Sequence, residues 1–117
     1  MDAAGKNREI IIYQHMQEIT VDELKSRLDA GEHLNVIDVR EPNEYAEYNI
    51  DAKLIPLGNI MSMQIDDLEP LKNEELIIHC RSGKRSMQAC MMLETMGFTN
   101  VKNVVGGILA WQEKFGK

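Results

Sequence analysis

The sequence has 117 residues, which is enough for one compact domain and too few for two. Its 44% hydrophobic and 27% charged residues are typical of soluble globular proteins, and a formal net charge of −6 argues against nucleic acid or an anionic membrane as a partner. No apolar run approaches the about 20 residues of a membrane-spanning helix. With no recognisable signal peptide, the expected location is the cytoplasm.

The first pattern along the chain is a capped helix. Residues 1–18 mix charged and amide side chains, so we interpret them as an N-terminal extension whose second half can be helical, followed by a single domain over 19–117. Thr20 is the predicted N-cap, because Glu23 follows three residues later, and Gly31 is the predicted stop. The apolar residues of this helix recur at helical spacing: Val21, Leu24 and Leu28.

Short elements follow the first helix. Residues 34–39 are rich in branched aliphatic side chains and predict a buried strand. Asn43 is a candidate cap for a short helix that ends near Tyr48. Residues 53–56 predict another strand, and residues 57–68 predict a helix with one apolar stripe.

The second half of the chain carries the strongest patterns. Residues 75–80 predict a strand that is buried on both faces, and residues 84–96 predict a helix. Residues 101–105 predict the last strand, and a final helix follows Gly106 and Gly107. The apolar stripe of the helix over 84–96 comprises Met87, Cys90, Met91 and Met96. Strands that alternate with helices indicate an α/β fold with a mostly parallel sheet, in which ligands bind beyond the carboxyl ends of the strands.

Cys80 stands at such an end, in a segment that can bind an anion. Residues 80–86 join the strongest strand to the strongest helix, so their backbone amides can converge on one point. Arg81, Lys84 and Arg85 add three cations to a protein that is acidic overall. These groups favour a thiolate and should lower the pKa of Cys80 from about 8.5.

The alternative is that Cys80 is an inert buried thiol and that the cations form a solvated loop. We consider it weaker, because an inert thiol gains nothing from a glycine-containing turn and adjacent cations. Cys90 is instead interpreted as a core residue of its helix. The chain has no CxxC motif, and its three histidines are scattered, so we expect no metal and no cofactor.

Four motifs in order resemble the rhodanese family, and the resemblance covers roughly residues 19–115. Residues 38–45, beginning Asp-Val-Arg-Glu-Pro, are similar to the family's first signature, and residues 55–57 to the strand and turn that follow it. Residues 80–86 are similar to the active-site loop, and residues 106–111 to the closing signature.

The resemblance implies a five-stranded, mostly parallel sheet flanked by helices on both faces. It also implies a sulfurtransferase that uses no cofactor, in which Cys80 accepts sulfur from thiosulfate or a persulfide donor. A thiophilic acceptor, which is cyanide, a thiol or a sulfur-relay protein, then removes the sulfur. By the same resemblance Arg85 orients the loop and acts with Cys80, while Arg81 and Lys84 attract the donor. The loop amides from Arg81 to Ser86 hold the outer sulfur, which makes the substrate-binding set Arg81, Ser82, Gly83, Lys84 and Ser86.

The chain departs from the family after the first signature, where Tyr48-Asn49 replaces the usual Gly-His pair. We therefore expect Asn49 or Asp51 to adopt the conformation that a glycine normally provides. Other residues of the family motifs are interpreted as structural rather than catalytic. These are Asp38, Arg40 and Glu44, as a polar cluster near the sheet edge, and Trp111, as the core anchor of the last helix.

Two other functions compete with sulfur transfer. Phosphatases that resemble rhodaneses, and arsenate reductases, also place a thiolate in an anion-binding loop. The rhodanese-like phosphatases have five residues between cysteine and arginine, whereas four residues separate Cys80 from Arg85. The second alternative is a non-catalytic binding or regulatory module, but such modules commonly lack the loop cysteine.

Overall fold

The central strand of the sheet is β4 (Glu75–His79), which is also its most apolar strand. The computed structural model describes residues 17–116, so the interpretation of residues 1–16 as an extension lies outside the described residues. All strand pairs are parallel, in the order β1-β5-β4-β2-β3, which confirms the predicted α/β fold. The strands are β1 (Gln17–Ile19), β2 (Asn35–Asp38), β3 (Lys53–Leu54), β4 (Glu75–His79) and β5 (Asn100–Val104).

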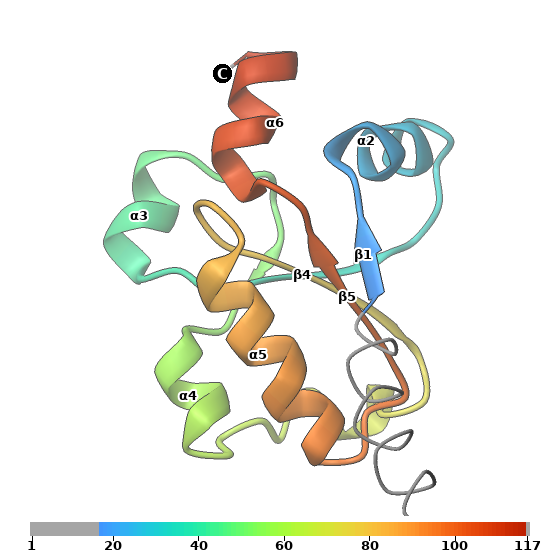
Figure 1. Cartoon of the computed structure of the whole chain (residues 1–117), viewed down its shortest axis with the longest axis vertical. Coiled ribbons are helices and arrows are strands. Elements are labelled where there is room, and N and C mark those ends of the chain that lie inside the picture. Colours follow the sequence, from blue (N-terminus) through green and yellow to red (C-terminus); the bar gives the residue numbers. More distant parts are fainter. Residues whose placement is uncertain (1–16, 117) are drawn as a thin grey trace, which may run out of the picture.

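Helices cover both faces of this sheet. Ile78 of β4 packs with residues of α4 (Leu57–Met61) and α5 (Lys84–Thr95), whereas Ile77 packs with α2 (Val21–Asp29) and α6 (Gly107–Phe115). Because successive strand residues point to opposite faces, the two helix pairs lie on opposite sides, as Figure 1 shows. Two short helices complete the fold, α3 (Pro42–Glu47) and the 3-10 helix η1 (Glu69–Leu71). Within residues 17–116 no helix is long and apolar enough to span a membrane.

Several local predictions are confirmed. The Thr20 hydroxyl oxygen accepts a hydrogen bond of 3.0 Å from the Glu23 amide, as expected of an N-cap, and Gly31 has a φ of +87° just after the end of α2. Trp111 is only 9% exposed and packs in the core between α2, α6 and the sheet. Asp51 supplies the conformation that the missing glycine would have provided, with a φ of +64°.

The starts of two elements differ from prediction. Residues 17 and 18, assigned to the extension, belong to β1, which is too short to show a periodic pattern. These residues form a strand because they pair with β5, and the local sequence does not encode that pairing. Helix α3 starts at Pro42 with Glu41 as its N-cap residue, so Asn43 is not the cap. The Glu44 carboxylate accepts a 2.9 Å hydrogen bond from the Glu41 amide, and proline suits the first helical position.

The predicted helix over 57–68 is right at its start and wrong in its length, because only its first five residues are helical. Helix α4 ends at Met61, and Met63 has a φ of +62°, which no regular helix accommodates. The chain then continues through turns, one of them closed by a 2.7 Å hydrogen bond from the Gln64 amide to the Asn59 carbonyl. Ile60 reaches the core from α4, and Ile65 and Leu68 reach it from the irregular segment that follows.

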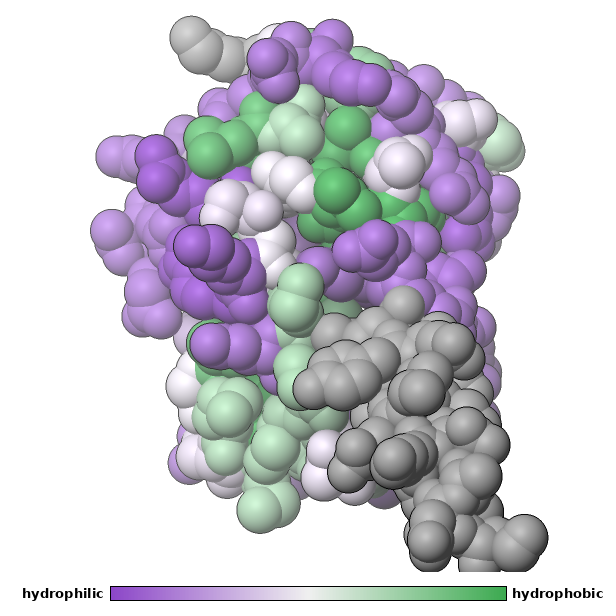
Figure 2. All heavy atoms as spheres, viewed as in Figure 1, coloured by the Kyte–Doolittle hydropathy of each residue, from purple (hydrophilic) through white to green (hydrophobic). Residues whose placement is uncertain are grey.

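The buried face of α5 differs from the predicted methionine stripe. Met87 and Met91 are 42% and 49% exposed. Figure 2 shows the resulting hydrophobic surface, pale green, over α4 and α5. The residues that α5 buries are Ser86, Ala89, Cys90 and Leu93, and Met96 of the predicted stripe is partly buried against the same core, so only Met87 and Met91 depart from the prediction. The prediction that Cys90 is a core residue is confirmed.

Candidate active site

The Cys80 sulfur lies at the centre of the turn between β4 and α5. Cys80 follows the last residue of β4 and is 1% exposed. Its sulfur accepts hydrogen bonds from the backbone amides of Gly83, at 3.1 Å, and Ser86, at 3.3 Å. Gly83 has a φ of +109°, a conformation open to glycine, and this lets the chain fold back over the sulfur before α5 begins. The loop therefore forms the amide cradle that its sequence predicts.

The electrostatic balance in this cradle favours the thiolate. Burial is the largest single influence and would by itself raise the pKa of Cys80. The backbone amides of residues 82, 83 and 86 act in the opposite direction, and the net result is a lowered pKa. Cys80 is thus more readily ionised than an ordinary thiol despite its burial.

Two of the three loop cations are available to an anion. The Arg85 guanidinium forms a two-pronged ion pair with the Glu44 carboxylate of α3, at 2.7 and 2.9 Å. Hydrogen bonding to Arg85 lowers the pKa of Glu44 to about 2, so this carboxylate is charged at neutral pH. Arg81 and Lys84 are exposed and have no ion-pair partner among the described residues.

A side chain that the sequence analysis did not select, Asn103, completes the site. Its amide oxygen lies 2.5 Å from the Ser86 hydroxyl, and its amide nitrogen lies 3.3 Å from the Gly83 carbonyl oxygen. Asn103 is 4% exposed and lies in β5, which pairs with β4. A buried amide side chain between the apolar residues Val101 and Val104 was the available signal.

The polar cluster of the first signature divides into two parts. Asp38 and Arg40 are buried and joined by an ion pair of 2.8 Å, and Arg40 also donates a 2.7 Å hydrogen bond to the Tyr48 carbonyl oxygen. Glu44 contributes its backbone carbonyl to this cluster, at 3.4 Å from Arg40, while its side chain binds Arg85 instead. The structural interpretation therefore fits Asp38 and Arg40, and Glu44 links the first signature to the loop.

Helix α6 supports the loop from behind. The Ile108 amide donates to the Cys80 carbonyl oxygen at 2.9 Å, and the Leu109 amide donates to the Arg81 carbonyl oxygen at 3.0 Å. Gly107 makes this approach possible, because a Cβ atom there would lie 2.7 Å from the carbonyl carbon of Arg81.

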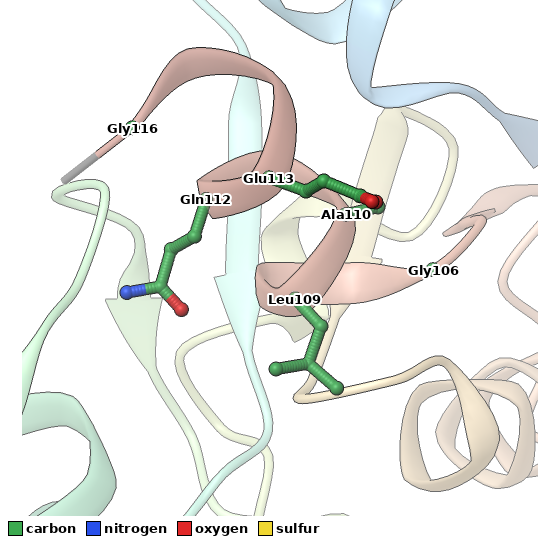
Figure 3. Close-up of a pocket in the computed structure, with 6 residues that line it drawn as sticks. All are labelled: Gly106, Leu109, Ala110, Gln112, Glu113 and Gly116. Atoms are coloured by element: carbon green, nitrogen blue, oxygen red, sulfur yellow. The ribbon is translucent and has the colours of Figure 1, made fainter.

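A shallow pocket runs along α6 next to this support. Figure 3 shows it, with Leu109 and Gln112 among the labelled side chains at its wall. Among the described residues, Glu113 is the only charged one in its lining, and Cys80 does not line the pocket. Residues 17–116 contain no group of three or more His, Cys, Asp or Glu side chains that could hold a metal ion.

Comparison with known proteins identifies relatives along most of the chain. The model of the rhodanese-like domain matches residues 20–114. A putative sulfurtransferase of Bacillus subtilis, YtwF, is 42% identical over 98 residues, which cover 83% of this chain and 91% of YtwF. The putative sulfur carrier protein YrkF of the same organism is 38% identical over 83% of this chain and 51% of YrkF.

A solved structure agrees with these sequence relatives. The crystal structure of a rhodanese-like domain protein from Staphylococcus aureus superimposes with a TM-score of 0.73 at 37% identity, covering 82% of this chain and 91% of that one. The relatives support sulfur transfer as the general activity. The chain belongs to the family of rhodanese-like domains.

Proposed function

We propose that this protein transfers a sulfane sulfur from thiosulfate or a persulfide donor to a thiophilic acceptor through a persulfide on Cys80. The observation that carries the proposal is the position of the Cys80 sulfur, which receives two backbone amide hydrogen bonds at the carboxyl end of β4. Because its pKa is lowered, the Cys80 thiol at this position forms the nucleophilic thiolate more readily than an ordinary cysteine does.

The reaction has two steps. In the first, the Cys80 thiolate attacks the outer sulfur of thiosulfate, a new S–S bond forms, and sulfite leaves with the electron pair of the broken S–S bond. In the second, cyanide or a thiolate attacks the outer sulfur of the persulfide, and the Cys80 thiolate leaves with the electron pair. Because the enzyme alternates between free and sulfur-loaded forms, ping-pong kinetics are expected.

The loop provides groups for the charge on the outer sulfur. Lys84 and Arg85 are the first two residues of α5, so their backbone amides have no acceptor within the helix. Together with the amides of Arg81, Ser82 and Gly83, these N–H groups can stabilise the persulfide anion. Arg85 orients the loop through its ion pair with Glu44.

The acceptor is a thiophile, which is a small molecule or a protein in a sulfur relay. The relative YrkF is named as a putative sulfur carrier protein, which supports a protein partner. The exposed positive charges of Arg81 and Lys84 attract an anionic donor or an acidic partner protein to the loop. No cofactor is needed for either step, and a cytoplasmic location stays a prediction.

Sulfur loading of single-cysteine variants tests this proposal. After incubation with thiosulfate, intact mass spectrometry should detect one added sulfur atom on the wild type and on Cys90→Ser, with release of sulfite, and none on Cys80→Ser. Subsequent addition of cyanide should remove the added sulfur and form thiocyanate. Equal loading of Cys80→Ser, or aryl phosphate hydrolysis by a wild-type protein that takes up no sulfur, would contradict the proposal.

A further inference from the structure

The Ser86 hydroxyl lies between two acceptors but has only one proton. Its oxygen is 3.3 Å from the Cys80 sulfur and 2.5 Å from the Asn103 side-chain oxygen. All three groups are buried, with Cys80 1%, Ser86 0% and Asn103 4% exposed. Because water does not reach these groups, the direction in which the Ser86 proton points affects whether Cys80 is a thiol or a thiolate.

The surroundings of Asn103 fix that direction. Its side-chain nitrogen lies 3.3 Å from the Gly83 carbonyl oxygen, which can only accept a hydrogen bond. The Asn103 amide therefore presents its oxygen, also an acceptor only, to Ser86. The Ser86 hydroxyl must then donate to Asn103, and its lone pairs face the Cys80 sulfur.

We propose that Asn103 is a positioning residue that holds the Ser86 proton away from the Cys80 sulfur and so leaves the resting thiolate incompletely hydrogen-bonded. The inference rests on Cys80 being the nucleophile of the proposed function. In the thiol form, the Cys80 S–H can donate to the Ser86 oxygen. In the thiolate form, the sulfur depends on the amides of Gly83 and Ser86.

When Cys80 carries the added sulfur, the missing hydrogen bond from Ser86 no longer matters. In the persulfide the negative charge moves to the outer sulfur, and the inner sulfur becomes a weak acceptor that no longer needs the Ser86 proton. Asn103 thus disfavours the free thiolate without disfavouring the loaded form, which shifts the equilibrium between the two toward the loaded form. A less stabilised thiolate is also intrinsically more nucleophilic, because nucleophilicity rises with the pKa of the thiol.

The test is a titration of Cys80, which needs no sulfur donor and stands apart from the activity. The rate of iodoacetamide alkylation at Cys80, resolved by mass spectrometry of peptides, gives its pKa as a function of pH. In Asn103→Leu the freed Ser86 hydroxyl should turn to the sulfur and lower the pKa of Cys80 by about one unit, a tenfold shift toward thiolate. The alkylation rate at high pH, where all Cys80 is thiolate, should fall.

The Ser86→Ala background separates this role from a structural one. There Asn103→Leu should shift the pKa of Cys80 by no more than about 0.3 unit, since no hydroxyl proton is available to redirect. If Asn103 only ties Gly83 in place, its loss loosens the amide cradle and raises the pKa in both backgrounds, which would overturn the proposal. Arg85 and Cys90 are the ionisable groups that interact with Cys80, and neither is changed in any of these variants.

Ser86→Ala alone provides a measurement that does not depend on the folding of Asn103 variants. If Asn103 holds the hydroxyl proton, removing the hydroxyl should leave the pKa of Cys80 unchanged or slightly lower. A rise of about one unit would mean that the hydroxyl donates to the thiolate in the wild type, and the proposal would then be wrong.

Discussion

Cys80 and Cys90 are both buried free thiols, yet their surroundings shift their pKa values in opposite directions. Burial raises the pKa of Cys90 to about 12, and the negative charges of Glu94 and Cys80 add to this effect. At Cys80 the hydrogen bonds from the loop amides oppose burial, and the net effect is a lowered pKa. Cys80, the proposed nucleophile, and Cys90, a core residue, are thus only ten positions apart, and their pKa values differ because of hydrogen-bond donors rather than because of exposure.

The free cations of the loop lead to a prediction about donor charge. Lys84 is exposed and unpaired among the described residues, so Lys84→Gln should lower kcat/KM for thiosulfate, a dianion, by about threefold to tenfold at low salt. The effect should shrink at high salt and be absent for a neutral donor. The measurement is the steady-state rate with both donors at two ionic strengths.

Two further variants serve as controls for this prediction. Lys53→Gln removes a similarly exposed charge that pairs with Asp67, and it should leave both donors unaffected. Arg85→Gln should impair both donors, because Arg85 is already neutralised by Glu44 and positions the loop. Equal effects of Lys84→Gln on both donors, without salt dependence, would mean that Lys84 shapes the loop.

At the scale of elements, the site is a junction of β4, α5, β5 and α6. Gly107, at the start of α6, lies so close to the backbone of Arg81 that any side chain would displace the loop, and its φ of +55° adds a conformational cost. The contacts of Ile108 and Leu109 with the loop depend on this approach. The closing signature therefore acts on catalysis through the backbone of the loop.

Gly107→Ala tests this coupling between α6 and the loop. The substitution should reduce the rate of sulfur loading by at least about tenfold, since misplacing reacting groups by about 1 Å costs on that order or more. Gly58→Ala is the matched control, because no atom lies within 4 Å of the added Cβ and its φ is not in the left-handed region. It should leave loading unchanged and alter stability by less than about 1 kcal/mol in either direction. Normal loading by a folded Gly107→Ala protein would contradict the coupling.

The sequence predicts elements well where local pattern and tertiary role agree. The strand, turn and helix over residues 75–96 follow from a continuous apolar run, a glycine turn and helical spacing. β1 has three residues and forms because β5 offers an edge, so no local pattern could predict it. The apolar spacing over residues 57–68 suits one helix, but it arises from the short helix α4, which buries Ile60, and from the irregular segment after it, which buries Ile65 and Leu68.

The same distinction holds for the site. The amides and cations of the loop could be predicted because they lie within seven consecutive residues, 80–86. The ion pair of Arg85 with Glu44 and the hydrogen bond of Ser86 with Asn103 join residues 41 and 17 positions apart. Such partners depend on how the elements pack, and their spacing in the chain does not reveal them.

At the scale of the whole molecule, partly buried ion pairs lie at both ends of the sheet. Near its amino end, hydrogen bonds from Arg27 and Lys102 lower the pKa of Glu75 to about 2 and tie α2 and β5 to β4. Near its carboxyl end, a hydrogen bond from Arg85 lowers the pKa of Glu44 to about 2. The stability from these pairs is present above the usual glutamate pKa of about 4.5 and is lost as the pH falls from there toward about 2.

Protonation of His79 affects the stability of the fold at higher pH than protonation of these carboxylates does. It is 1% exposed, and neither ring nitrogen makes a hydrogen bond to the described residues, although Nε2 lies 3.7 Å from the Asp38 carboxylate. Burial is the main cause that lowers the pKa of His79, Asp38 acts against it, and Arg40 acts with it. The folded protein therefore binds a proton here less readily than the unfolded chain, whose histidine pKa is about 6.5.

Stability should consequently fall as the pH drops below about 6.5, by up to about 1.4 kcal/mol per pH unit from this group alone. Urea unfolding between pH 7.5 and 5, in steps of about half a unit, measures this slope. His79→Gln removes the titrating ring and should flatten the slope, whatever its own effect on stability at pH 7.5. His33→Gln, at an exposed position, should keep the wild-type slope. If His79→Gln and the wild type lose stability in parallel over this range, then protonation of His79 does not oppose folding, and its burial does not control the acid sensitivity of the protein.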